Sequence, residues 1–178
     1  MNVRPGGSAK DKDLVVSEMS DLERLVATED IKQLKSRRDR AVDLRDWETL
    51  EALHAPDHQS HVEGFPPWTS AAEMIRNIKT SFEGVVSVHQ SHTPDITFES
   101  PSRARGVWAM EDFLTWEQDG REHWLRGYGF YEEVYERRDG RWVYVWRRLT
   151  RLKVNMSEGA VLPATRNLQA IDGAGPPS

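Results

Sequence analysis

The chain has 178 residues, of which 38% are hydrophobic and 30% charged, and its formal net charge is -5. This length fits one globular domain with tails. The acidic balance argues against a nucleic-acid partner, which needs a basic surface to pair with phosphates. The chain contains no cysteine, which excludes disulfides and thiolate chemistry. No apolar run approaches the roughly 20 residues that span a bilayer, so we expect no membrane association.

Composition along the chain predicts three parts. Residues 1–19 form a flexible polar leader without the apolar region of a secretory signal, which favours a cytoplasmic location. Residues 20–155 form the folded domain. Residues 156–178 carry Pro163, Pro176 and Pro177 and read as a C-terminal arm or tail.

The first half of the domain has helical patterns. Ser20 and Glu23 have the spacing of a capping box, and Thr28 is a second start signal. A stripe with helical spacing then follows, with a cation in its middle. Its members are Ile31, Leu34, Arg38, Ala41, Val42 and Arg45.

Three further elements complete this half. A short helix is expected after Asp46, to be stopped by Pro56. Residues 58–63 can form a strand. A second capping box at Ser70 and Glu73 opens another helix, whose apolar face holds Met74, Ile75, Ile78 and Phe82.

The second half changes to strand patterns. The segments with this pattern are 85–92, 95–100, 106–116, 125–136 and 142–154. Asp119-Gly120 and Asp139-Gly140 join the last three into an antiparallel meander, because Asp-Gly supplies the positive φ of two-residue hairpins. Helices followed by a long curved sheet predict an α+β fold, a cone-shaped α+β barrel with a mixed or antiparallel sheet.

The pattern of two neighbouring strands predicts an apolar pocket inside this cone. One strand places Trp108, Met110 and Asp112 on one face. The next places Gly127, Gly129 and Tyr131 on one face and Tyr128 and Phe130 on the other. Two glycines opposite bulky side chains leave a gap that can bind a small apolar molecule. The alternative is a bend or bulge in a curved sheet.

Several polar residues could supply chemistry to such a pocket. His89 and Asp43 could form a general-base pair, although helical periodicity alone makes Asp43 a solvated residue. Arg38 must find an ion-pair partner or face the pocket. Arg147 and Arg148 face opposite sides of the last strand, so one of them points inward and could hold an oxyanion. The alternative is a bridge to Asp112 or Glu111.

Metal and cofactor sites receive little support. His54 is expected at the end of a helix, and His58 and His61 on opposite sides of a strand, which is a weak metal pattern. The sequence has no G-x-G-x-x-G, P-loop or G-x-S-x-G motif. We therefore expect no cofactor and no bound metal.

The combined pattern resembles a known family. The segments that carry the resemblance are SDLERLVATEDIKQLKSRRDRAVDLRDWETLEALHAPD, VHQSHTPDITF, GVWAMEDFLTWEQDG and YERRDGRW. They are similar to the SnoaL-like branch of the nuclear-transport-factor-2-like superfamily, over about residues 20–155. Within it the chain resembles the group of scytalone dehydratase, hexachlorocyclohexane dehydrochlorinase and bile-acid 7α-dehydratase.

The resemblance implies a cofactor-independent lyase with a histidine base oriented by an aspartate. Those residues fall on His89 and Asp43. The place of a family lysine or tyrosine is taken by Arg38, and a pocket arginine of the last strand falls on Arg147, or on Arg148 after a one-residue slip. Arginine can only donate while staying charged.

The expected function is a dehydratase-type elimination on a steroid-like or polyketide-like ring compound. Tyr128 or Tyr131 would donate to the leaving group. The alternatives are a double-bond isomerase in the same pocket and a non-catalytic binding or assembly module. Trp146 and Phe130 on the outer sheet face predict a homo-oligomer, a dimer or a trimer.

Overall fold

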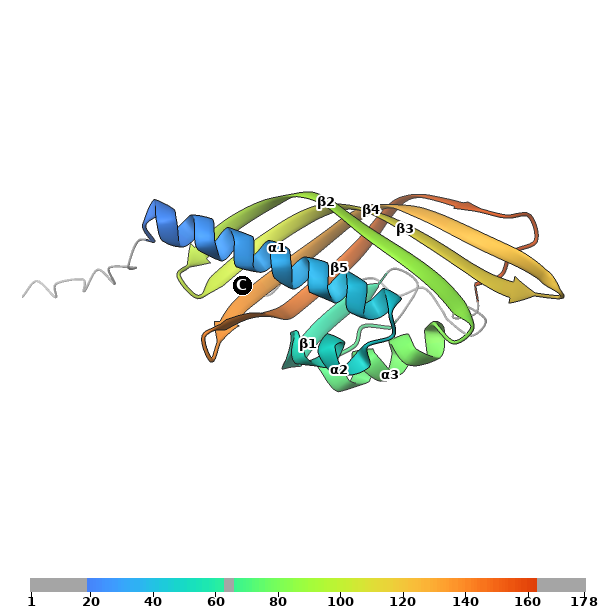
Figure 1. Cartoon of the computed structure of the whole chain (residues 1–178), viewed down its shortest axis with the longest axis horizontal. Coiled ribbons are helices and arrows are strands. Elements are labelled where there is room, and N and C mark those ends of the chain that lie inside the picture. The colour runs from blue at the N-terminus through green and yellow to red at the C-terminus, as the bar shows by residue number, and fades with distance from the viewer. Residues whose placement is uncertain (1–18, 63–65, 163–178) are drawn as a thin grey trace, which may run out of the picture.

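The computed structural model describes residues 19–62 and 66–162. The predicted leader up to residue 18, and the predicted tail from residue 163 onward, lie outside the described residues. Within the described ranges, no helix combines the length and the apolar character needed to cross a membrane. Three helices lie against one face of a curved five-stranded sheet (Figure 1). The predicted α+β class is confirmed.

Helix α1 spans Asp21–Asp43 as one continuous element, so the second start at Thr28 is wrong. The capping box at its start is present: Glu23 N–H donates to Ser20 Oγ, and the Glu23 carboxylate accepts from the Ser20 backbone. The helix ends before Arg45, which the sequence pattern had placed on the helical stripe. Arg45 instead adopts a φ of 61°.

Helix α2, Trp47–Ala52, is capped by Asp46, whose side chain accepts from Thr49 N–H. It ends earlier than expected, because strand β1 already begins at His54 and spans His54–Val62. Helix α3, Ala71–Ser81, begins after Ser70 as predicted and buries Met74, Ile75 and Ile78. Figure 1 shows α2, α3 and β1 gathered at one end of α1.

The sheet has the order β1-β5-β4-β3-β2. Strands β2 (Val85–Ser100), β3 (Arg103–Gln118), β4 (Arg121–Arg138) and β5 (Arg141–Met156) are antiparallel neighbours, and β1 is parallel to β5. The two expected strands at 85–92 and 95–100 are one strand with an irregularity between Ser91 and Pro94. The sheet is therefore mixed and open, and does not close into a barrel.

Two tight hairpins set the register of the meander. Asp119 and Gly120 have φ values of 53° and 71°, and Asp139 and Gly140 have 51° and 77°. Positive φ at both central residues is the requirement of a two-residue hairpin turn, so the Asp-Gly prediction is confirmed. The resulting register places His89 opposite Asp112, and Asp112 opposite Gly127.

The main core lies between α1 and the sheet. Its buried members include Ile31, Leu34, Trp108, Met110 and Tyr135. Trp108 Nε1 donates to the Tyr135 hydroxyl at 2.8 Å, so the indole is satisfied inside this core.

The expected apolar outer face of the sheet needs one correction. Phe130 is exposed, but Trp146 is only 1% exposed and packs with Ala55, Val134 and Val145. The His61 ring lies near the Trp146 indole, with ring centres 5.6 Å apart. Trp146 is therefore a packing residue and does not belong to an exposed oligomer face.

Candidate functional site

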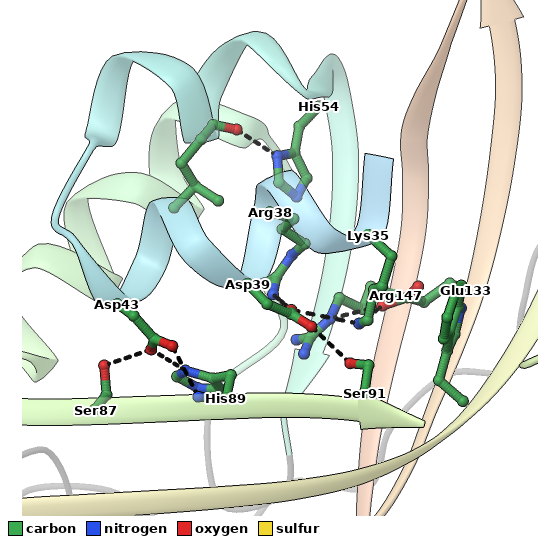
Figure 2. Close-up of polar contacts among 12 residues, drawn as sticks. Lys35, Arg38, Asp39, Asp43, His54, Ser87, His89, Ser91, Glu133 and Arg147 are labelled. Atoms are coloured by element: carbon green, nitrogen blue, oxygen red, sulfur yellow. Dashed lines mark hydrogen bonds and ion pairs between the residues drawn. The ribbon is translucent and has the colours of Figure 1, made fainter. Parts of the chain in front are cut away.

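The site is organised around a histidine–aspartate pair that joins α1 to β2 (Figure 2). Asp43 is the last residue of α1, and its Oδ1 lies 2.6 Å from Nδ1 of His89. The backbone N–H of His89 donates to Asp43 Oδ2 at 2.9 Å. An ionised carboxylate can only accept, so Nδ1 carries the proton and Nε2 of His89 is left as an acceptor.

His89 lies in the wall of a cavity of about 460 Å³. This volume suits a small ring compound. The wall is mostly apolar, with side chains from all five strands, α1 and α3. Its apolar members include Val42, Ile78, Phe82, Leu114, Leu125 and Leu149. Leu162, which follows β5, also contributes to the wall.

The polar members of the wall come from α1, from α3 and from strands β2 to β5. Besides His89 they include Arg38 on α1, Asp112 on β3, Tyr131 on β4, and Arg147 and Arg151 on β5. The structure thus brings Arg38, His89, Asp112, Tyr131 and Arg147 to one cavity. Asp43 stands behind His89. Arg147 is the inward residue of the pair on β5.

Six predicted substrate contacts lie outside this wall. Trp108 and Met110 belong to the core between α1 and the sheet. Tyr128 is half-buried on the other face of β4, away from Tyr131. Arg148 donates to Glu132 at 2.5 Å on that same outer face. The remaining two are Gly127 and Gly129.

The two glycines do not create the cavity. A side chain at Gly127 would clash with the Asp112 carboxylate, which pairs with Arg151 directly over this position. A side chain at Gly129 would clash with the backbone of Thr150, where the register between β4 and β5 shifts. The bulge interpretation is therefore correct for Gly129, and Gly127 makes room for an ion pair.

A buried charge cluster lies beside the cavity (Figure 2). Lys35 donates to Glu133 Oε1 at 2.7 Å, and Arg147 Nε donates to the same oxygen at 3.2 Å. Lys35 Nζ also lies 3.7 Å from Asp39 Oδ1, and the same oxygen lies 3.5 Å from Arg38 Nη1. The two cations Lys35 and Arg147 lie 3.8 and 4.0 Å from the centre of the Tyr131 ring.

Burial and pairing shift the pKa values in this cluster. Burial lowers the pKa of Lys35 to about 8, against the opposing effect of Asp39 and Glu133. Burial alone would raise the pKa of Asp39, but Lys35 and Arg38 outweigh it, so the pKa is lowered and the carboxylate stays ionised. Burial also raises the pKa of Tyr131, which therefore keeps its phenolic proton.

Arg38 is the least satisfied cation of the cluster. It is buried, and among the described residues its ion pair is with Asp39 while its Nε has no hydrogen-bond partner. A buried guanidinium without full pairing is costly. Arg38 also lies in the cavity wall, so its guanidinium places a positive charge beside the space that a bound molecule would occupy.

Two buried histidines, His54 and His58, lie behind Arg38, with ring centres 4.6 Å apart. His54 begins β1 instead of ending a helix, and its Nδ1 lies 2.6 Å from the Leu50 carbonyl oxygen. Burial, followed by the Arg38 and Arg147 cations, lowers the pKa of His58 to about 3. Among the described residues, no group of three histidine, aspartate or glutamate side chains gathers as a metal site would require.

These shifts predict acid sensitivity. His58 binds a proton below pH 6.5 in the unfolded chain but only near pH 3 in the folded one. The unfolded state then binds more protons, so the free energy of unfolding falls as the pH is lowered from about 6.5. Urea titrations of His58→Leu should show a shallower fall than the wild type. The exposed His92→Leu control should keep the wild-type slope, and a wild-type slope for His58→Leu would contradict the assignment.

Five residues of the site escaped the sequence patterns: Lys35, Asp39, Ser87, Glu133 and Arg151. Lys35 and Asp39 stand four and eight residues after Ile31, on the same helical stripe. Glu133 continues the inward alternation of Gly127, Gly129 and Tyr131. The charged residues thus lie on the same inward-facing positions of α1 and β4 as the apolar residues that the periodicity identifies.

The fold is an α+β cone: helices cover one face of an open curved sheet. The cavity lies between them and carries His89 of the Asp–His pair in its wall. A family model for the SnoaL-like domain matches residues 23–148. The chain belongs to the SnoaL-like domain family.

Solved structures share this fold. Hexachlorocyclohexane dehydrochlorinase LinA type 2 is similar at 20% identity and a TM-score of 0.71, over 79% of this chain and 95% of that one. LinA type 3 from Novosphingobium barchaimii LL02 has 20% identity and a TM-score of 0.69, over 79% and 97%. A protein assigned as a scytalone dehydratase from Novosphingobium aromaticivorans DSM 12444 has 16% identity and a TM-score of 0.71, over 89% and 100%. These identities support the shared fold alone.

Proposed function

We propose that the chain is a cofactor-independent lyase that eliminates water from a small hydrophobic ring compound. The observation that carries this proposal is the contact of His89 Nδ1 with Asp43 at 2.6 Å in the wall of an apolar cavity. It leaves Nε2 of His89 as the nitrogen that can accept a proton from a molecule in the cavity. Neighbours in fold named as a dehydrochlorinase and a dehydratase agree with an elimination.

The first step is proton abstraction. Nε2 of His89 takes a proton from the carbon next to a carbonyl of the substrate. The imidazole becomes cationic, and Asp43 stabilises that cation through Nδ1–H. Ser87 donates to Asp43 Oδ1 at 2.9 Å and holds the carboxylate in place. The electron pair of the broken C–H bond moves toward the carbonyl oxygen.

The second step is loss of the hydroxyl group. Arg38 and Arg147 lie in the cavity wall and stabilise the oxygen that gains negative charge. The electron pair then forms a carbon–carbon double bond as the carbon–oxygen bond breaks. The leaving hydroxide needs a proton to become water. Tyr131 is the protonated phenol of the wall that can supply it, and His89 can return its proton to Tyr131 afterwards.

Solvent-deuterium incorporation tests the base directly. A library of hydroxylated ring ketones is incubated in deuterium oxide, and exchange of the proton next to the carbonyl is followed by NMR. The wild type should catalyse exchange or elimination on at least one ring compound. Asp43→Asn should slow it by roughly 10²- to 10⁴-fold, because the amide no longer stabilises the cationic imidazole. Exchange at the wild-type rate in Asp43→Asn would contradict the mechanism.

A further inference from the structure

A strained arginine lies directly behind the histidine–aspartate pair. Arg45 follows the end of α1 with a φ of 61°, a left-handed conformation that is unfavourable for an L-residue with a side chain. A glycine would adopt it without this cost. We therefore expect the contacts of the Arg45 side chain to offset the unfavourable backbone conformation.

Those contacts tie the end of α1 to β2. Arg45 Nη1 donates to the Val42 carbonyl at 2.5 Å and to Ser87 Oγ at 2.9 Å. Arg45 Nη2 donates to the Val85 carbonyl. The guanidinium lies 5.0 Å from the centre of the Phe82 ring. One side chain thus joins the last turn of the helix to the strand that carries His89.

The direction of the hydrogen bonds follows from the chemistry of the groups. A guanidinium has no acceptor, so Ser87 Oγ must accept from Arg45. The Ser87 hydroxyl proton is then free to point at Asp43 Oδ1, 2.9 Å away. The Asp43 carboxylate accepts three hydrogen bonds together, from the Ser87 hydroxyl, the His89 backbone N–H and the His89 Nδ1–H. Its carboxylate therefore has a fixed rotation.

We infer that Arg45 and Ser87 are positioning residues that hold Asp43 so that His89 keeps its proton on Nδ1 and presents Nε2 to the cavity. This inference rests on the proposed function, because it explains how the proposed base is kept in its reactive tautomer. Asp43 is the last residue of α1, where helix ends fray. The Arg45–Ser87 link removes that freedom.

The imidazole tautomer of His89 tests this role directly. It should change if Arg45 and Ser87 position Asp43, and it should stay the same if they only stabilise the fold. Protein labelled with ¹⁵N at histidine is studied by two-dimensional NMR in the pH range where His89 is neutral. The wild type should show the Nδ1–H tautomer with a downfield, slowly exchanging Nδ1 proton. Ser87→Ala and Arg45→Gly should both show a mixture of tautomers and lose the slow exchange. Arg45→Gly also relieves the strained φ, which favours its folding.

Two matched variants serve as controls. Ser87→Thr keeps the hydroxyl group and should retain the wild-type spectrum. Leu44→Ala removes an exposed side chain next to Arg45 without loosening the backbone, and it should retain the wild-type spectrum too. A wild-type tautomer in both Ser87→Ala and Arg45→Gly would overturn the positioning role alone. An Nε2–H tautomer in the wild type would overturn the proposed function as well.

Discussion

Replacement of His89 by glutamine is expected to lower kcat by roughly 10²- to 10⁴-fold, the usual contribution of a general base. Glutamine keeps the size and polarity of the side chain but cannot accept the substrate proton and pass it on. KM should change little, because the apolar wall that surrounds the ring compound remains. Steady-state kinetics on a substrate found by the deuterium screen would measure both constants.

The control for His89→Gln is His92→Gln. His92 lies on the same strand, three residues further, but its side chain is exposed. This variant should retain the wild-type kcat and the wild-type melting temperature. Full turnover by His89→Gln would show that another group is the base.

Replacement of Glu133 by glutamine is expected to cost about 3–5 kcal/mol in the free energy of unfolding, the usual effect of removing one partner from a buried ion cluster. Glu133 is 2% exposed and accepts from Lys35, Arg147 and the Tyr135 hydroxyl. Its neutral isostere leaves Lys35 and Arg147 as adjacent buried cations with too little compensating charge. Urea titration would measure the loss.

Glu132→Gln is the matched control for this prediction. Glu132 precedes Glu133 on β4 but lies on the outer face, where it pairs with the partly exposed Arg148. Surface pairs contribute about 0–1 kcal/mol, so its loss should be small. Equal losses for Glu132→Gln and Glu133→Gln would mean that the buried cluster carries no special stability.

The sequence predicts the elements of this fold well where one local pattern decides them. Ser20 and Ser70 begin helices because a side chain caps the first turn in each case. Asp119-Gly120 and Asp139-Gly140 make hairpins because the turn needs positive φ. The continuity of strand β2 is harder to predict from the sequence, because only the pairing with β3 shows that Pro94 can lie within a strand.

The site depends on contacts between distant parts of the chain, which periodicity does not reveal. Helical spacing alone made Asp43 a solvated residue. Its link to His89 bridges 46 positions. The pairing was expected from the chemistry of the two residue types and from the family resemblance, not from periodicity. Gly127 suggested an empty space, yet the Asp112–Arg151 pair occupies it, because Arg151 reaches across from β5. A pattern within one strand cannot show what the neighbouring strand supplies.

The central claim is that His89 drives an elimination inside the cavity, and the mass of the product tests it most directly. Hydroxylated ring ketones are incubated with the wild type and with His89→Gln, and the products are analysed by mass spectrometry. The mechanism requires a product lighter than its substrate by one molecule of water, formed by the wild type and absent with His89→Gln. A product of unchanged mass, or the same lighter product from both proteins, would contradict it.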